Sequence, residues 1–248
     1  MPVDKGETAA RHGYEQVAEQ LRSAILSQDF RPGSRLPNEN ELSEMFQVSR
    51  TTVREALRAL AAEKLITTRK GTTGGSFVTE PSIGQLTERL QVGLRLLAST
   101  TRISLDNFME LRQLLEVPSA GLAAARRTGD DLALLEETIP SPGRALPDQE
   151  QYHRNRDFHF VIIDICHNPL LRLAVEPMFV VLQTCLDRGK LPATFHTTVT
   201  RQHRAIAYAI QARDSALADR LMHEHLDWLH PRYRRVWRAG APDERSGQ

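Results

Sequence analysis

The chain has 248 residues, enough for one large domain or two of ordinary size, and 40% of them are hydrophobic, so a real core can form. The net charge is only +1, no apolar run approaches the ~18–20 residues that span a membrane, and the first dozen residues lack the apolar core of a signal peptide. Two cysteines, Cys166 and Cys185, cannot form a disulfide framework, so we expect a cytoplasmic protein whose cysteines serve in core packing.

The first elements in the chain are helical. Residues 14–25 carry apolar side chains at helical spacing, and Arg31-Pro32-Gly33 ends this helix with a turn. A second helix begins near Asn38, an N-cap candidate with Glu41 in position to complete a capping box. Residues 47–49 then turn the chain into a third helix. A helix, a short turn and an amphipathic helix in this order predict a helix-turn-helix.

The third helix has one apolar face and one cationic face. The apolar face comprises Val53, Ala56, Leu57 and Leu60, and the cationic face comprises Arg50, Arg54 and Arg58. Ser49 can cap the helix, which leaves Arg50, Thr51 and Thr52 in its first turn. Arginine forks onto guanine, while threonine offers a hydroxyl for phosphate and a methyl for thymine. The pattern favours a recognition helix in the major groove of DNA; the alternative is a solvated amphipathic helix.

Two short β-prone runs, residues 65–69 and 76–79, flank a glycine-rich turn at residues 70–75. After a helix-turn-helix such a hairpin is a wing, and Lys70 at its tip is positioned to approach a phosphate or enter the minor groove. The alternative for the glycines is turn geometry with no DNA contact. Residues 50–70 hold six basic and two acidic side chains, the local excess of positive charge that a small DNA-binding element needs.

Residues 14–79 resemble the winged helix-turn-helix of the GntR family of bacterial transcription regulators. The resemblance rests on three motifs: LPNENELS at 36–43, VSRTTVREAL at 48–57 and GGSFV at 74–78. It implies that a set of residues from the third helix and the wing faces DNA: Arg50, Thr51, Thr52, Arg54 and Gly71. The neighbouring Ser49 and Lys70 are further candidate DNA-binding residues.

One position departs from the family pattern. The family usually has an arginine, which commonly contacts DNA, where this chain has Asn40. Asparagine is shorter and uncharged, so it can reach a phosphate or an adenine edge but cannot fork a guanine. We therefore expect an altered operator preference or fewer contacts per half-site, with more of the base reading falling on Arg50, Thr51 and Arg54.

Beyond residue 81 the pattern is helical. A leucine stripe over residues 86–97 is followed by an apolar run from Leu105 to Leu122, and Pro118 should kink or break that second helix. Residues 139–144 form a loop, and further helical runs follow at about 149–166, 169–188, 197–212 and 214–229. No β pattern of comparable strength appears, so we predict a mainly α protein whose C-terminal part is an antiparallel bundle of six or seven helices.

Histidines carry the chemistry of this part. Asn155 and His159 lie four residues apart, so their side chains project from one face of a helix, and His203 and His225 lie on later helices. Three imidazoles and an amide oxygen that converge in a bundle would form a site for a divalent metal ion such as Zn, Ni, Co or Mn. The alternative for each histidine is a solvated side chain or a core residue.

Residues 84–230 are similar to the FCD domain, the all-α ligand-binding domain of the FadR subfamily within the same family. The matching residues are 111–116, 157–159, 168–171, 202–206, Ala218, Met222, His225 and Leu226. In many FCD domains an aspartate and three histidines bind a divalent metal ion. The resemblance puts His159, His203 and His225 at the histidine positions and Asn155 at the aspartate position.

Asparagine in place of aspartate leaves a bound ion with its full +2 charge. We therefore expect a weaker metal site that attracts an anionic effector more strongly. Asp157 lies two residues from Asn155 and should point elsewhere. Arg112 is a candidate clamp for an effector carboxylate, and the alternative for it is an ion pair with Glu116 four residues on.

These features predict four segments: a flexible tail at 1–13, a winged helix-turn-helix at 14–80, an effector-binding and dimerisation domain at 81–238, and a second tail at 239–248. We expect a homodimeric repressor, not an enzyme and with no membrane partner, that binds a short inverted repeat in double-stranded DNA and is released by a small organic acid. One alternative is a dimeric DNA-binding protein that senses no small molecule. Another is a metal-dependent hydrolase, against which stands the lack of a glutamate spaced as a general base beside the histidines.

Overall fold

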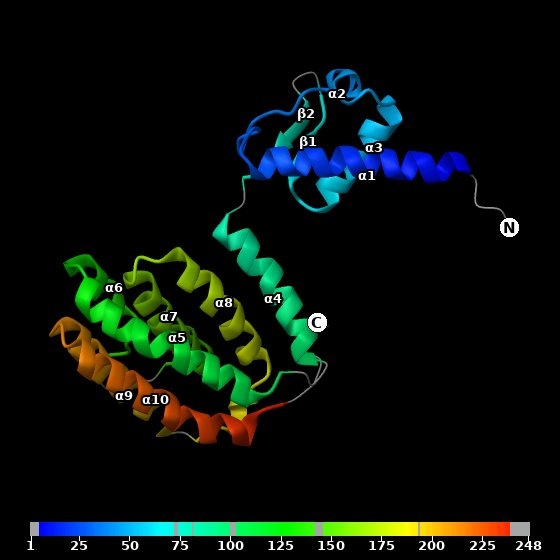
Figure 1. The fold of residues 1–248 in the computed structure, drawn as a ribbon. Coiled ribbons are helices and arrows are strands. Elements are labelled where there is room, and N and C mark those ends of the chain that lie inside the picture. The colour runs from blue at the N-terminus through cyan, green and yellow to red at the C-terminus, as the bar shows by residue number, and fades with distance from the viewer. Residues whose placement is uncertain are drawn as a thin grey trace. The chain divides into compact units, whose positions relative to one another are not determined.

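The computed structural model describes residues 5–71, 74–80, 82–99, 103–141, 146–192 and 194–238. Its chain divides into two units, Met1–Pro81 and Ser82–Gln248 (Figure 1). Each unit has a hydrophobic core of its own, and the two cores share no residue. The mainly helical architecture with one small hairpin confirms the predicted fold class.

The N-terminal unit is a winged helix-turn-helix. Helices α1 (Lys5–Leu26) and α2 (Glu39–Phe46) both pack against α3 (Arg50–Ala62). The wing is an antiparallel pair, β1 (Ile66–Arg69) and β2 (Gly75–Val78), in which Ile66 lies opposite Val78 and Arg69 opposite Gly75. The core between these elements is apolar and comprises Val17, Ala18, Leu21, Ile25, Leu36, Leu42, Val53, Ala56, Leu57, Leu60, Ile66 and Val78.

Helix α1 begins at Lys5, within the segment 1–13 that the sequence analysis assigned to an N-terminal tail. The physical reason is local: Ala9, Ala10 and Arg11 are strong helix formers that extend the helix backward from its buried part. The C-terminal tail predicted at 239–248 lies outside the described residues.

The C-terminal unit contains seven α-helices among its described residues, in agreement with the predicted number. They are α4 (Ile83–Ser99), α5 (Leu105–Arg126), α6 (Gly129–Glu137), α7 (Asp148–Ile165), α8 (Pro169–Thr184), α9 (Thr194–Gln211) and α10 (Ser215–Val236), with a 3-10 turn, η1 (Arg188–Lys190), before α9. Helix α5 is central, because α7, α8, α9 and α10 all pack against it (Figure 1). This central helix therefore supplies one wall of any site inside the bundle.

Capping residues set where the helices of this unit begin. Ser104 and Asn107 form a capping box at the start of α5, and Thr128 and Asp131 form another at the start of α6. Each box satisfies backbone N–H groups that the first helical turn leaves without a partner. None of the described helices is both long enough and apolar enough to cross a membrane.

Pro118 was expected to kink or break α5, and the structure contradicts the break. The helix runs through it from Leu105 to Arg126. A proline removes one helical hydrogen bond, but the residues beside it, Glu116, Ser119 and Ala120, are fully buried, and their packing outweighs that loss. Tertiary packing has overridden a local helix breaker here.

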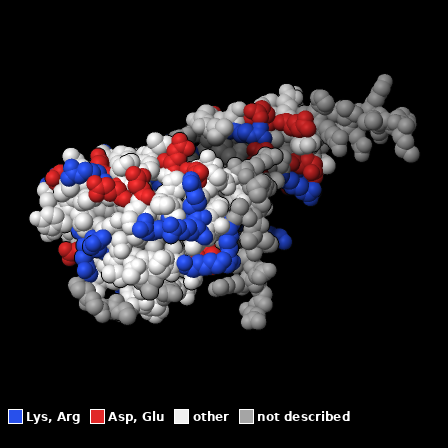
Figure 2. Space-filling model, turned by 90° about the horizontal axis from the view of Figure 1, so that it is seen from below, with Lys and Arg blue, Asp and Glu red and all other residues white. Residues whose placement is uncertain are grey.

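The leucine stripe predicted for α4 is only partly covered by the rest of the chain. Helix α4 packs against α8, yet Leu90 is 47% exposed and Val92 is 60% exposed. Charged residues of both signs are mixed over the face shown in Figure 2, in keeping with the net charge of +1. Helix α4 thus contributes several exposed apolar side chains to the surface of this unit, among them Leu90, Val92, Leu96 and Leu97.

Candidate functional site

Helix α3 presents a rigid cationic face. Ser49 caps it as predicted, since its Oγ accepts a hydrogen bond from the Thr52 amide at 3.1 Å. The apolar side of the helix is buried in the core, which leaves the side chains of Arg50, Arg54 and Arg58 61%, 49% and 68% exposed. An exposed arginine row on a short, capped helix matches the geometry of major-groove recognition.

The two threonines of the first turn differ in exposure. Thr51 is exposed, whereas Thr52 is half-buried and its hydroxyl lies 2.8 Å from that of Ser49. A Cβ on Gly13 of α1 would come within 3.4 Å of the Thr52 methyl, so α1 lies close against this turn. Thr51 is therefore the more accessible of the two predicted contacts.

Helix α2 is held in place by its own capping box, which confirms the sequence prediction. The Asn38 Oδ1 accepts hydrogen bonds from the amides of Asn40 and Glu41 at 2.9 and 3.1 Å, and the Asn38 amide donates to Glu41 Oε2 at 2.7 Å. Asn40 lies in the first turn of α2 with its side chain exposed. Its amide is therefore available to a ligand outside the protein.

Glu39, which sequence reasoning missed, lies between the two helices. Its carboxylate accepts hydrogen bonds from Arg54 Nε at 3.1 Å and from Arg54 Nη2 at 2.7 Å, and it lies 3.8 Å from Arg50 Nη2. The hydrogen bonds from Arg54 lower the pKa of the Glu39 carboxyl, so it is ionised at neutral pH. One acidic side chain thus orients the arginine row.

The glycines of the wing are demanded by its backbone. Gly71 has φ +107° and Gly75 has φ +144°, a region that side chains disfavour. Lys70 and Gly71 are exposed beside the tip, whose residues 72–73 lie outside the described part. Turn geometry alone therefore explains both glycines, while Lys70 stays a predicted DNA contact.

Inside the C-terminal unit, three histidines from three helices converge. His159 on α7, His203 on α9 and His225 on α10 are only 1%, 2% and 0% exposed. One ring nitrogen of each lies within 4.8 Å of the corresponding atoms of the other two, and no other group of this kind occurs among the described residues. These side chains, separated by 22 to 66 positions in sequence, thus form one cluster, the histidine centre.

Two of the three histidines, His203 and His225, are strongly favoured in the neutral form. Burial, together with the positive fields of neighbouring histidines and Arg112, lowers the pKa of His203 and of His225 well below the ordinary value. The Nε2 atoms of both rings are buried with no hydrogen-bond partner. His225 is oriented by its other nitrogen, because Nδ1 lies 2.9 Å from Gln202 Oε1. Neutral imidazoles whose free nitrogens face one another, with an orienting partner behind, have the chemistry of metal ligands.

Asn155 lies one helical turn before His159. Its Oδ1 is buried without a hydrogen-bond partner, and the residue lines a small hollow of about 10 Å³ together with His203. Because a buried polar atom normally has a partner, this oxygen fits the role of a donor atom toward a bound ion. Asp157, in contrast, bonds to Arg156 and does not face the histidines.

Arg112 lies beside the histidine centre but is already paired. Its guanidinium donates to both Glu116 oxygens at 2.6 and 3.1 Å, and it lies over the Phe179 ring at 4.5 Å. The ion pair that was the alternative for Arg112 is therefore present. Burial raises the pKa of the Glu116 carboxyl, but Arg112 and His159 outweigh burial and hold that pKa at about 2.

The Arg112–Glu116 pair contacts the histidine centre directly. Arg112 Nη2 lies 3.3 Å from His159 Nε2, and Glu116 Oε2 lies 2.7 Å from His159 Nδ1. A ligand bound at His159 would therefore lie next to the buried ion pair, whose two residues belong to helix α5. The i, i+4 spacing of Arg112 and Glu116 predicted the pair, but only the fold reveals its contact with His159.

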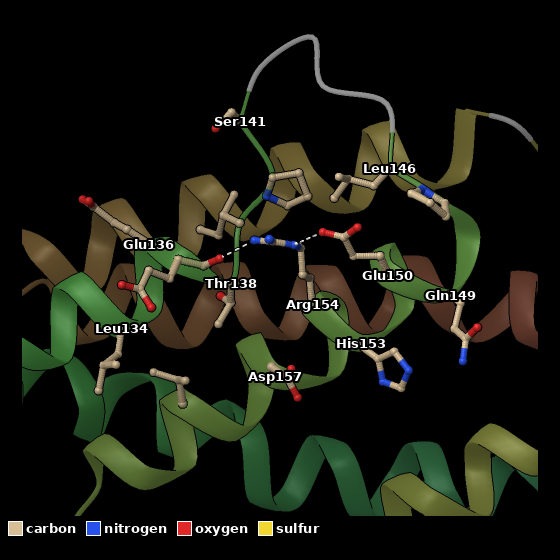
Figure 3. A pocket seen from close by; sticks show the side chains of 15 residues that line it. Leu134, Glu136, Thr138, Ser141, Leu146, Gln149, Glu150, His153, Arg154 and Asp157 are labelled. Carbon is tan, nitrogen blue, oxygen red and sulfur yellow. Dashed lines mark hydrogen bonds and ion pairs between the residues drawn. The ribbon is translucent and has the colours of Figure 1, made fainter.

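A larger hollow lies elsewhere in this unit. It has a volume of about 970 Å³ and lies between the end of α6 and the outer side of α7, where His153, Arg154 and Asp157 line it (Figure 3). Arg154 crosses it, with hydrogen bonds to Glu150 and to the Glu137 carbonyl. None of the three clustered histidines lines this hollow, so its size does not make it the centre of the chemistry.

Comparison with known proteins identifies both units. Residues 13–78 match the family "Bacterial regulatory proteins, gntR family", and residues 107–227 match the FCD domain. The chain is 30% identical over 239 residues to the HTH-type transcriptional repressor NanR of Klebsiella aerogenes, covering 94% of this chain and 88% of that protein. It is 31% identical over 208 residues to the HTH-type transcriptional regulator LutR of Bacillus subtilis, covering 82% of this chain and 92% of that protein.

A solved structure supports the same assignment. The GntR protein of Streptococcus agalactiae is 27% identical, with a TM-score of 0.57 over 88% of this chain and 99% of that one. The relatives named here are regulators of transcription and not enzymes. The hydrolase alternative is therefore set aside.

Proposed function

Because the chain belongs to the GntR family of bacterial transcription regulators and carries an FCD ligand-sensing domain, we propose that it is a metal-containing repressor released by a small carboxylate metabolite. The observation that carries the proposal is the convergence of three buried histidines, two of them strongly favoured in the neutral form, in a unit joined to a DNA-binding one. A repressor is favoured over an activator because NanR, a relative over most of the chain, is named a repressor.

The DNA-binding residues proposed are exposed on the N-terminal unit, apart from the half-buried Thr52. Arg50, Thr51 and Arg54 would read base edges from α3, and Asn40 would contact a phosphate or an adenine from α2. Ser49, Thr52, Lys70 and Gly71 would contact the DNA backbone. The exposure of the arginine row and the positive charge around it support this division.

The ligands proposed for a divalent ion are His159, His203, His225 and Asn155. Their support is chemical: unpartnered buried nitrogens on His203 and His225 and an unpartnered oxygen on Asn155 are the donors that such an ion needs. Three nitrogens and one neutral oxygen suit Zn, Ni, Co or Mn. When bound, the ion would supply a fixed positive charge and a coordination position for an oxygen ligand.

Charge balance favours an anionic effector. Glu116 already neutralises Arg112, and His203, His225 and Asn155 are uncharged, so nothing among these residues would offset the +2 charge of an ion. A carboxylate metabolite brings the compensating charge into a buried site. Arg112 would then contact the effector only by sharing its guanidinium with Glu116.

A homodimer would place two copies of α3 on an inverted repeat. Support comes from α4, whose exposed Leu90 and Val92 are the kind of apolar surface that a second subunit covers. Effector binding would then shift the population between an arrangement that matches the operator spacing and one that does not. It can do so only through different affinities for the two arrangements.

One experiment tests the proposal as a whole. The full chain, purified without chelators, is analysed for bound metal, and its operator is selected from random duplexes. A panel of small organic acids is then screened for release of that operator and for a shift in melting temperature. We expect stoichiometric metal and release by at least one acid. Specific DNA binding with no metal and no acid response would instead support a dimeric DNA-binding protein without sensing, and no specific DNA binding would contradict both.

A further inference from the structure

A second hollow in the C-terminal unit is strongly cationic. It has a volume of about 400 Å³ and lies between the start of α9 and the end of α10. Four of its lining side chains are basic: Lys190, Arg201, Arg232 and Arg235. No aspartate or glutamate is among the described residues that line it. Several Lys and Arg side chains gather on the face shown in Figure 2, although both signs of charge occur over the molecule. We call this site the arginine hollow.

Two of its four cations have no partner within the part of the chain that the structure describes. Arg201 and Arg235 are exposed, and neither forms a hydrogen bond or ion pair with another described residue. Lys190 is only partly neutralised, by Asp187 at 3.2 Å, and Asp187 is also bound by Arg238. Like charges that converge without a counter-charge repel one another, so a bound anion would relieve a cost that the protein otherwise carries.

Some arginines elsewhere in this unit are paired with acidic side chains, although Arg220 is exposed and has no such partner among the described residues. Arg154 bonds to Glu150, and Arg172 bonds to both Asp164 and Glu176. Arg235 lies in the last turn of α10, where a cation interacts favourably with the helix dipole, but Arg201 lies in the middle of α9 and has no such explanation. The helix dipole therefore explains the position of Arg235 but not that of Arg201.

An aromatic wall holds the hollow in shape. The rings of Phe195 and Trp228 stack at 5.4 Å, and Phe195 is only 5% exposed. Arg232 lies over the Trp228 ring at 3.7 Å and donates to the Trp228 carbonyl at 2.8 Å, so its guanidinium is already oriented. Pre-oriented arginine forks bind oxyanions with little ordering cost.

We propose that the arginine hollow binds a small polyanion whose negative charges lie close together. Its volume is at the lower end of those of small-molecule sites, which suits a compact metabolite. Two sources share this chemistry, a phosphorylated metabolite and a polycarboxylate. The guanidinium forks accept both, because each presents paired oxygens. No residue of the hollow belongs to the histidine centre, so this site is separate from the one proposed for the carboxylate effector.

The test is calorimetric titration of the full chain at constant ionic strength. Fructose 1,6-bisphosphate probes the phosphate source, and tricarballylate probes the polycarboxylate source. We expect at least one of them to bind the unmodified protein, and the Arg201→Gln/Arg235→Gln variant to bind it about tenfold more weakly or worse. A matched control, Arg31→Gln/Arg220→Gln, removes two exposed arginines outside the hollow and should bind as the unmodified protein does.

A His203→Gln variant separates this site from the histidine centre and should keep the polyanion affinity. Four results would overturn the proposal: no binding of either probe, an equal loss in both double variants, a loss confined to His203→Gln, or an effect of Arg201→Gln/Arg235→Gln on duplex DNA binding alone. Circular dichroism and melting temperature establish that each variant is folded. Because the polyanion titrations themselves use neither operator DNA nor metal, the proposal can fail or hold whatever the outcome for the repressor function.

Discussion

The Glu39 carboxylate on α2 accepts two hydrogen bonds from the Arg54 guanidinium on α3, at 3.1 and 2.7 Å. From the sequence we expected Arg54 to take over part of the base reading, because this chain has Asn40 where the family usually has an arginine. In the structure its fork is occupied. Arg54 can contact DNA only with the guanidinium atoms that Glu39 does not bind. Glu39 therefore sets both the orientation of Arg54 and the net charge of the exposed face of α3.

Glu39→Gln should loosen operator recognition. The neutral amide no longer fixes Arg54, which gains freedom to contact a phosphate, so affinity for random duplex should rise and the ratio of specific to non-specific affinity should fall. The slope of log affinity against log salt should steepen by about 0.9, the value for one added phosphate contact. Fluorescence anisotropy over a salt series measures all three quantities.

The matched control is Glu63→Gln. It releases Arg22, which Glu63 binds at 2.6 Å, within the same unit but between α1 and the end of α3. Its salt slope and specificity ratio should stay as in the unmodified protein. Equal slopes for Glu39→Gln and the unmodified protein would show that Arg54 keeps its place without the carboxylate.

Arg50→Ala should cost about 1–3 kcal/mol of specific binding and relax the preference at one base of each half-site. Arg50 is 61% exposed at the first turn of α3 and has only a 3.8 Å contact with Glu39. Arg58→Ala is the comparison. Arg58 lies about two helical turns after Arg50 and bonds to Glu55, so its loss should lower affinity by the same factor for every DNA sequence. Selection from random duplexes with each variant reads out the base preference. An unchanged preference with Arg50→Ala would remove Arg50 from base reading.

Asn155→Asp should strengthen metal binding and weaken binding of an anionic effector. A carboxylate at this position would supply a charged oxygen ligand and cancel one unit of the ion's charge. Metal retention during dialysis against a graded series of chelator concentrations measures the first effect, and titration with an effector acid measures the second. Asp157→Asn, on the same helix but facing the outer hollow, is the control and should change neither. Weaker metal retention in Asn155→Asp would place Asn155 outside the ligand set.

Arg112→Met should destabilise the C-terminal unit by about 3–5 kcal/mol, because it leaves the Glu116 carboxylate buried without its cation. The double variant Arg112→Met/Glu116→Met should recover much of that loss, since it removes both charges. Both tryptophans, Trp228 and Trp237, belong to this unit, so tryptophan fluorescence during urea unfolding reports on it selectively. A double variant as unstable as the single one would mean that Arg112 contributes through packing and not through the ion pair.

Local signals in the sequence predicted local structure well. Asn38 with Glu41, and Ser49 before the arginine row, defined the starts of α2 and α3 because a cap acts within three residues of itself. Pro118 misled because its effect depends on the packing around α5, which no local pattern contains. Leu90 misled for a related reason: an apolar stripe does not reveal whether the same chain or a second one covers it.

Contacts between distant residues were the hardest to predict. Glu39 and Arg54 lie 15 positions apart on different helices, and no periodicity connects them. His159, His203 and His225 were grouped through their resemblance to a known domain, since spacing alone leaves each of them a solvated or core residue. The arginine hollow had no sequence signal, because Lys190, Arg201 and Arg235 come from three separate elements.

The separation of the two hydrophobic cores has a consequence for how this protein can evolve. Since no side chain belongs to both cores, a substitution that retunes operator preference on α3 leaves the packing around the histidine centre unchanged, and the reverse also holds. If the chain works as the proposed repressor, the operator that it reads and the metabolite that it senses can change through separate point mutations. Recombination within the short connection between β2 and α4 can likewise exchange one property while conserving the other.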